Sequence, residues 1–366
     1  MAAVWVALAE SPATSPTPAP AASPEPAAPA ASPAAVEPPL SERERLQALT
    51  ADEVRRAIES VRKTFMDPAA TGDDAMQRAT LQGLLARLSP GVVLAPARGA
   101  GDGGAYPFLA EILDSRIGYV RPGKLDGGTL AQFDTALASF SAKGVGSLIL
   151  DLRDNGGRAD FENAAEFARR LCPKGGLLFT LQKPIAKQER IFTATADPAF
   201  KGTVVVLTDS RTSGAAEALA GTLRENIGAM IIGSDTAGAA VEFERIPAGA
   251  GQVLEIAVSQ ILLPEAGSLF PGGVKPDIAS SIPRATQDRI FRESKDKGVG
   301  KFVFETERRR LNEAALVSGT NPEIDGARDG RDEPEPLPRD AVLQRAVDLV
   351  TAIEFFAPGR RARPQP

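Results

Sequence analysis

Short apolar runs and amphipathic stretches alternate along the middle of the chain. The runs at residues 145–152 and 202–208 end at polar or glycine-bearing turns, and a stretch with helical periodicity follows each of them. Such runs predict buried β-strands, and their alternation with helices from residue 112 to residue 233 predicts α/β layers with largely parallel strands. We predict a strand or hairpin at 112–121 and strands at 177–181, 230–233 and 253–263. Helices are predicted at 129–141, 160–171 and 213–225. The runs 145–150, 204–207 and 230–232 are predicted to be neighbouring strands of a single sheet.

Helical periodicity also marks both flanks of this region. Residues 41–49, 50–66 and 73–88 have it on the N-terminal side, where Thr50 or Asp52 caps the second helix and Pro68 closes it. On the C-terminal side the pattern predicts helices at 305–317 and 340–355. The polar, proline-rich stretch 321–338 between them predicts a loop.

The N-terminal 40 residues have a different composition. Residues 2–9 are apolar, and residues 7–9 resemble a small-residue cleavage site, although no positive residue precedes them. Residues 11–39 are nearly all Pro, Ala, Ser and Thr, which predicts an extended linker without a core. A leader followed by such a tether favours a cell-envelope protein, periplasmic or secreted, whose only membrane attachment is the leader. A plain apolar tail is the alternative.

These patterns divide the chain into five parts. They are an apolar leader at 1–10, a disordered linker at 11–40, a helical N-terminal part at 41–110, an α/β core at 111–300, and C-terminal helices with a proline-rich loop at 301–366.

Composition narrows the function classes. The chain of 366 residues is 43% hydrophobic, enough for a sizeable core, and its net charge is −5 with basic residues interspersed among acids. Together with 5% aromatic residues, this argues against nucleic-acid binding. The lone Cys172 excludes an internal disulfide framework and is interpreted as a small core residue at the end of a helix.

Two segments have the form of active-site loops at strand ends. They read SLILDLRDNGG, residues 147–157, and VVVLTDSRTSGAAEALAGTL, residues 204–223. A serine on such a turn needs a base, yet the chain contains no histidine and no lysine between Lys201 and Lys275. The loops therefore predict a site whose usual base is missing.

Five segments in order resemble the tail-specific, or C-terminal-processing, serine peptidases. They are RIGYVR, LILDLRDNGG, TDSRTSGAAEALAGTL, IIGSDTAG and LPEAGSLFPGGVKPDI, spread over residues 116–278. The resemblance implies the α/β fold of that family, a crotonase-like β-α spiral core, here with a helical N-terminal part and a helical C-terminal extension. Family members often carry a PDZ domain before the core. Residues 90–118 are too few for one, so we expect none.

The resemblance also assigns site residues. The longer, gap-free alignment places Gly214 in the nucleophile column, while a shorter one places Ser213 there as the candidate nucleophile. The family's catalytic lysine falls at Ala239, and the glutamine that orients it falls at Phe243. The glycine pair Gly156 and Gly157, with the amide of Gly214, is implied as the oxyanion-binding backbone.

Two functions follow from this reading. By resemblance the chain is a serine-type peptidase that acts on peptide or unfolded-protein C-termini, with weak or lost catalysis because the lysine is absent. The alternative is a noncatalytic protein that binds a peptide or an apolar ligand. The pattern around Ser213 is also similar to the noncatalytic modules of interphotoreceptor retinoid-binding protein. We predict no cofactor and no metal site.

Other polar residues have a structural and a catalytic interpretation. Asp151 and Arg153 are interpreted as an ion pair at a strand end, and residues 99–104 as a flexible loop that lacks the lysine of a phosphate-binding loop. Thr212 and Ser213 suit the cap of the following helix. Five carboxylates near the same loops are candidates for a base or metal ligand, but we favour turn caps and solvated strand ends for them: Asp209, Glu217, Asp235, Glu242 and Glu244.

Overall fold

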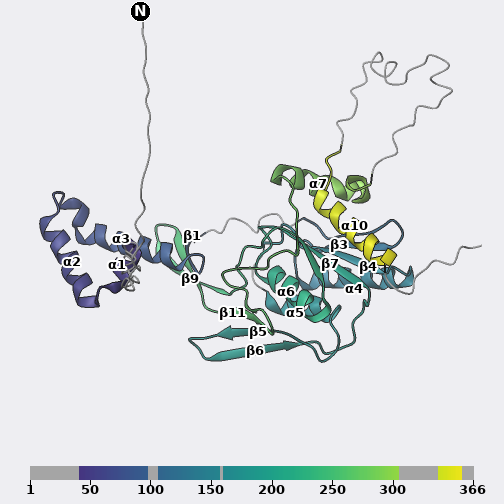
Figure 1. Cartoon of the computed structure of the whole chain (residues 1–366), viewed down its shortest axis with the longest axis horizontal. Helices are drawn as coiled ribbons and strands as arrows, with labels where there is room; N and C mark the ends of the chain where they lie inside the picture. The colour runs from purple at the N-terminus through teal and green to yellow at the C-terminus, as the bar shows by residue number, and fades with distance from the viewer. Residues whose placement is uncertain (1–40, 98–105, 157–159, 305–336, 357–366) are drawn as a thin grey trace, which may run out of the picture. The chain divides into compact units, whose positions relative to one another are not determined.

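The computed structural model describes residues 41–97, 106–156, 160–304 and 337–356, and the chain divides into two units, Met1–Met76 and Gln77–Pro366 (Figure 1). The predicted leader and linker, the glycine-rich stretch 99–104, the helix at 305–317 and nearly all of the loop at 321–338 lie outside the described residues.

The described part of the first unit, residues 41–76, is helical. Ser41 caps α1 (Glu42–Ala48) and Thr50 caps α2 (Ala51–Thr64), each in a capping box with the glutamate three residues on. Thr50 rather than Asp52 is thus the cap of α2. A 3₁₀ turn, η1 (Ala69–Thr71), then leads into α3 (Asp73–Leu88), which continues into the second unit. These helices confirm the predicted ones.

A six-stranded sheet forms the centre of the second unit. Its order is β13-β8-β7-β4-β3-β2, and every neighbouring pair is parallel except β3 and β2. The predicted neighbours 145–150, 204–207 and 230–232 lie in β4, β7 and β8, side by side. The strands are β2 (Leu109–Leu113), β3 (Ile117–Arg121), β4 (Ser147–Asp151), β7 (Thr203–Thr208), β8 (Met230–Gly233) and β13 (Ile278–Ala279).

Helices cover both faces of this sheet, as Figure 1 shows. Leu148, Leu150 and Val206 pack into a core with α4 (Gly127–Ala142), α5 (Phe161–Arg169) and α6 (Ala215–Ile227). The alternate residues Ile149 and Val205 pack under α10 (Ala341–Phe356) on the other face. Strand residues buried on both faces explain why these segments are continuous apolar runs. The predicted α/β class with flanking helices is confirmed.

Two smaller antiparallel sheets complete the second unit. One has the order β12-β11-β5-β6 and the other β1-β10-β9. Their strands are β5 (Leu177–Lys183), β6 (Gln188–Thr193), β11 (Gln260–Leu263) and β12 (Gly267–Ser268), and β1 (Val92–Pro96), β9 (Phe243–Gly249) and β10 (Gln252–Ala257).

Some predicted elements differ from the structure. The single strand predicted at 253–263 is wrong, because the backbone N–H of Val258 and the side chain of Ser259 bond to Glu242 and turn the chain between β10 and β11. Strand β1 lies within the part 41–110 that was predicted to be helical overall, after the last helix predicted there, at 73–88. Helix α7 (Arg284–Lys297) was not predicted, since its buried side is partly polar, with Gln287 and Ser294 beside Ile290 and Phe291. Cys172 is buried as predicted, and burial raises the pKa of its thiol to about 12.

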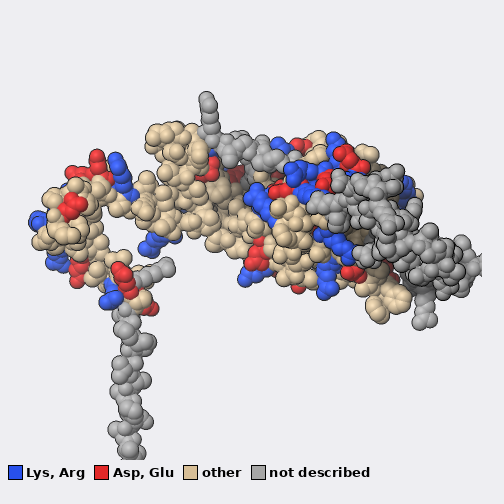
Figure 2. Space-filling view, turned by 90° about the horizontal axis from the view of Figure 1, so that it is seen from above, with Lys and Arg blue, Asp and Glu red and all other residues tan. Residues whose placement is uncertain are grey.

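The surface mixes charges of both signs. Figure 2 shows Lys and Arg interspersed with Asp and Glu on the visible face, as the sequence indicated. Within the described part of the chain, no helix combines the length and apolar character needed to cross a bilayer.

Core packing beneath α5 gives a first prediction. Phe167 is fully buried and its ring stacks on Phe133 with centroids 5.1 Å apart. Phe167→Ala removes this packing and leaves a cavity, so the free energy of unfolding in urea should fall by about 3–5 kcal/mol. Phe355→Ala is the matched control, because Phe355 is 82% exposed; its change should stay within about 0.5 kcal/mol. Equal losses in the two variants would contradict this core.

Candidate functional site

The two predicted loops meet at the carboxyl ends of the parallel strands β4 and β7. The backbone N–H of Ser213 donates to the carbonyl of Asn155 at 3.1 Å. A Cβ on Gly156 would lie 3.6 Å from the hydroxyl oxygen of Ser213 and 3.0 Å from the carbonyl oxygen of Arg211. The glycine of one loop therefore packs directly against the candidate serine of the other. Gly157 lies outside the described residues.

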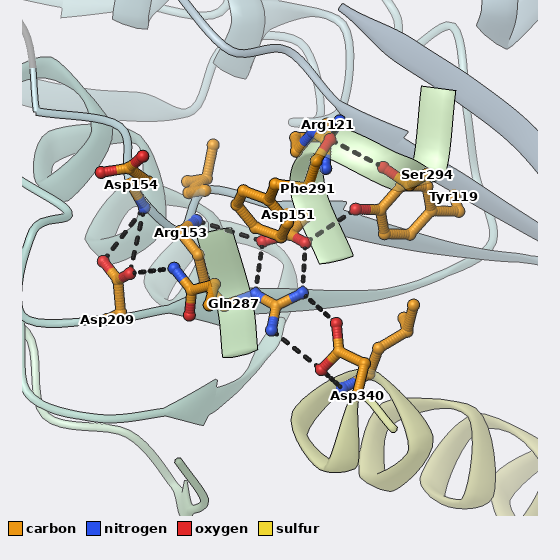
Figure 3. Close-up of polar contacts among 12 residues, drawn as sticks. Tyr119, Arg121, Asp151, Arg153, Asp154, Asp209, Gln287, Phe291, Ser294 and Asp340 are labelled. Carbon is orange, nitrogen blue, oxygen red and sulfur yellow. Dashed lines mark hydrogen bonds and ion pairs between the residues drawn. The ribbon is translucent and has the colours of Figure 1, made fainter. Parts of the chain in front are cut away.

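The Asp209 carboxylate organises both loops. It accepts hydrogen bonds from the backbone N–H groups of Asp154, Arg211 and Thr212 at 2.9–3.1 Å. It also accepts one from the side-chain amide of Gln287 on α7 at 2.7 Å, as Figure 3 shows. The predicted turn-capping role of this carboxylate is thereby confirmed.

Gly214 occupies a turn that L-residues rarely adopt. Its backbone has φ 58° and ψ −116°, immediately before the first residue of α6. A positive φ of this kind suits glycine and strains any other residue. Its N–H, which the resemblance assigned to the oxyanion site, donates instead to the carboxylate of Glu217 at 2.9 Å.

Glu217 joins the nucleophile loop to the turn after β8. One oxygen, Oε2, accepts from the N–H of Gly214 at 2.9 Å and from the N–H of Ala239 at 2.7 Å. The other, Oε1, accepts from the N–H of Gly238 at 2.6 Å and from the hydroxyl of Thr236 at 2.5 Å. Gly214 and Ala239, the two residues aligned with the family's nucleophile and lysine, therefore lie next to each other on a single carboxylate oxygen.

The Glu217 side chain is fully buried, with no cation among its hydrogen-bond partners in the described residues. Burial raises its pKa above the ordinary value, and the bonds from Thr236 and the three amides oppose that shift only in part. The carboxylate thus holds two loops together at a cost in desolvation.

The described residues offer Ser213 no base. Its hydroxyl has no hydrogen-bond partner in that part of the chain, and Lys201 and Lys275 are exposed. Lys183 forms an ion pair with Glu242 at 2.8 Å, and Asp235 and Glu244 are exposed. In the same described ranges, no group of three or more Cys, Asp or Glu side chains is arranged to hold a metal ion.

Phe243, aligned with the family's glutamine, lies in a separate sheet. It is the first residue of β9, and it pairs with Ala257 of β10. The structure thus brings Gly214, Ala239 and Glu217 together and packs Ser213 against Gly156. It does not bring Phe243 into this group, because Phe243 begins strand β9 of another sheet.

Asp151 and Arg153 form a buried network at the end of β4, which confirms the predicted ion pair. Arg153 bonds to both oxygens of Asp151 at 2.9 and 2.6 Å and to both oxygens of Asp340 at 2.9 and 2.8 Å (Figure 3). The hydroxyl of Tyr119 donates to Asp151 at 2.8 Å. Burial lowers the pKa of Arg153, but the two carboxylates outweigh it and raise the pKa above its ordinary value.

Sequence analysis missed two members of these networks. Asp340 bonds to the N–H of Leu343 in the first turn of α10, so its position just before a helical pattern was a signal for a cap. Nothing in the sequence indicated Arg153 as its second partner. Thr236 likewise gave no sign of its contact with Glu217, 19 residues away in the chain.

Both loops and Glu217 lie in the part of the chain that matches a known protein family. Residues 116–280 match the model of peptidase family S41, and the resemblance drawn from the sequence is confirmed. A carboxyl-terminal-processing protease from Synechocystis sp. is 27% identical over 175 residues, which are 47% of this chain and 40% of that protein. A chloroplastic C-terminal processing peptidase from Tetradesmus obliquus is 29% identical over 164 residues, or 44% and 35%. The chain matches less than half the length of these curated relatives.

Solved structures with similar folds include a photosystem II D1 C-terminal processing protease, with a TM-score of 0.41 and 24% identity over 57% of this chain and 53% of that one. A putative peptidase from Parabacteroides merdae has a TM-score of 0.47 and 16% identity over 74% of this chain and 90% of that one.

The Arg153 network gives a second prediction. Asp340→Ala removes one of the two carboxylates that neutralise a fully buried guanidinium and uncaps α10, so the free energy of unfolding should fall by about 3–5 kcal/mol. Asp348→Ala on the same helix removes an exposed aspartate bonded to Gln344 and is expected to change it by less than about 0.5 kcal/mol. Urea denaturation measures both. A loss of less than about 1 kcal/mol, the scale of an exposed ion pair, would contradict a buried role for Asp340.

A third prediction concerns the pH dependence of Glu217. Burial raises the folded pKa of Glu217 above the ordinary value for a glutamate. Its contribution to stability is therefore fully present below the pKa of the unfolded state and is lost as the pH rises through the folded pKa. The difference in unfolding free energy between wild type and Glu217→Gln should therefore shrink from pH 4.5 toward neutrality. Urea titrations across that range measure it. A difference that grows with pH would show that the four donors outweigh burial.

Proposed function

Residues 116–280 form a domain of peptidase family S41, and we propose that this domain binds polypeptides without hydrolysing them. The observation that carries the proposal is the contact of Gly214 and Ala239 with one oxygen of Glu217. These two backbone contacts support the alignment with nucleophile and lysine, because a nucleophile and its base must lie close together.

Neither position supplies the chemistry of a serine peptidase. Such an enzyme needs a hydroxyl nucleophile and a nearby group that takes its proton. Gly214 has no side chain, and Ala239 has only a methyl group. A domain without both groups keeps at most the residual acceleration of its binding and oxyanion contacts, about 10³–10⁴-fold over water in a well-studied serine protease.

Ser213 does not replace the missing nucleophile in this proposal. Its hydroxyl lies beside Gly156 and has no proton acceptor within hydrogen-bond distance in the described part of the chain. An unactivated serine hydroxyl attacks an amide too slowly to support peptidase turnover. The two loops remain packed together, and we assign to them the binding of a polypeptide.

The ligand class rests on the relatives. They are named as carboxyl-terminal-processing proteases, so the proposed ligand is the C-terminal segment of an unstructured polypeptide. The apolar leader and the proline-rich tether support a place in the cell envelope, periplasmic or secreted.

Restoration of the catalytic pair gives the fourth prediction. The wild type and Ser213→Ala should both leave a fluorogenic unstructured peptide uncleaved, because neither has a base. The double variant Gly214→Ser with Ala239→Lys should gain turnover of at least about tenfold over either single variant, since the two positions are adjacent. Thermal denaturation of each variant controls for the strain of serine at a positive φ, about 1–3 kcal/mol.

Binding is measured separately, by fluorescence anisotropy of a labelled unstructured peptide with a free C-terminus and of the same peptide with an amidated one. Saturable binding of the free form supports the proposal. Wild-type cleavage that disappears in Ser213→Ala would refute the noncatalytic function, and absence of saturable binding to both peptides would refute the polypeptide ligand.

A further inference from the structure

A cavity lies at the carboxyl edge of the central sheet, and Gly214, Glu217 and Ala239 do not line it. It has a volume of about 310 Å³, within the range of small-ligand pockets. Its walls come from the residues that directly follow the parallel strands β7, β8 and β13, and α7 and α10 close its other side. The carboxyl ends of parallel strands are where open α/β sheets bind ligands.

Serine hydroxyls line this cavity. Ser210 follows β7, Ser234 follows β8, and Ser280 and Ser281 follow β13. None of these four hydroxyls has a hydrogen-bond partner among the residues that the structure describes. Each hydroxyl can donate one hydrogen bond, so this wall suits a small ligand that carries acceptor oxygens.

Two arginines in the wall, Arg211 and Arg284, make the cavity favour a negatively charged ligand. Arg211 bonds through Nε to Asp154 at 3.0 Å and through Nη2 to Asp288 at 3.4 Å, which fixes its guanidinium at the wall. Arg284 stands at the start of α7 with its side chain 75% exposed, and its nearest carboxylate is Asp288 at 3.7 Å. Most donors of Arg284 are therefore free to bind an anion in the cavity.

Asp209 is the one acidic side chain among the described residues that line the wall, and its oxygens already accept from other donors. Its oxygens accept from the N–H groups of Asp154, Arg211 and Thr212, the hydroxyl of Thr212 and the amide of Gln287. Arg153, also in the wall, is neutralised by Asp151 and Asp340. Among the described residues, the four serine hydroxyls have no hydrogen-bond partner and Arg284 has only its 3.7 Å ion pair with Asp288, and all of these groups can donate.

We propose that this cavity is a binding site for a small oxyanion, a phosphate or a carboxylate, held by Arg284 and by the hydroxyls of Ser280 and Ser281. The cavity borders the loops of the proposed polypeptide site through Asp209, Ser210 and Arg211, but neither Gly156 nor Ser213 lines it. Its occupancy by an anion needs no peptidase or peptide-binding activity.

Isothermal titration calorimetry of the purified full chain with inorganic phosphate and, separately, with acetate tests the proposal, at an ionic strength kept constant with chloride. Saturable binding of either anion is expected, and the tighter one identifies the oxyanion class. Arg284→Ala, and separately Ser280→Ala with Ser281→Ala, should weaken binding at least about tenfold through loss of charge-assisted contacts. Arg292→Ala is the matched control, since Arg292 lies on the same helix, is exposed and does not line the cavity; it should change the affinity less than about twofold.

Thermal denaturation without anion confirms that each variant is folded, which is expected because Arg284 is on the surface. Absence of saturable binding by both anions, or equal affinity in wild type and in both cavity variants, would overturn the proposal. Neither result depends on peptide binding or cleavage, so failure here is distinct from failure of the proposed function.

Discussion

Arg153 between Asp151 and Asp340 is the interaction on which the arrangement of the second unit depends. Its guanidinium joins the end of β4 to the first turn of α10, and it lies over the ring of Phe291 on α7 at 5.0 Å. A buried cation is tolerated only with full neutralisation, so all three segments must be in place together. The ion pair therefore couples the C-terminal helix to the strand end from which the candidate site is built.

Glu217, in the first turn of α6, imposes a similar constraint. A buried carboxylate with no cation is costly unless donors surround it, and here three backbone amides and one hydroxyl do so. Because backbone N–H groups supply most of the bonds, the side chains at Gly214 and Ala239 are not needed to hold the loops. The arrangement of the loops therefore does not depend on which side chains stand at these two positions.

The sheet edge serves two regions with different chemistry. On one side, the loops after β4 and β7 meet at Ser213 and Gly156. On the other, serine hydroxyls in the loops after β7, β8 and β13 line a cavity together with Arg284 of α7. Asp209 lies between the two regions and binds both loops and α7. Parallel strands bring their carboxyl ends to one edge, so both regions follow from a single topology.

The sequence by itself determined the α/β class, the neighbouring strands β4, β7 and β8, and the loops at their ends, because apolar runs and helical periods are local signals. It also determined that Gly214 and Ala239 lack catalytic groups, which is a matter of residue type. Only the tertiary structure decided that one oxygen of Glu217 joins those two residues, that Asp340 completes the Arg153 pair, and that four serines surround one cavity. These contacts join residues far apart in the chain, and packing rather than local propensity selects them.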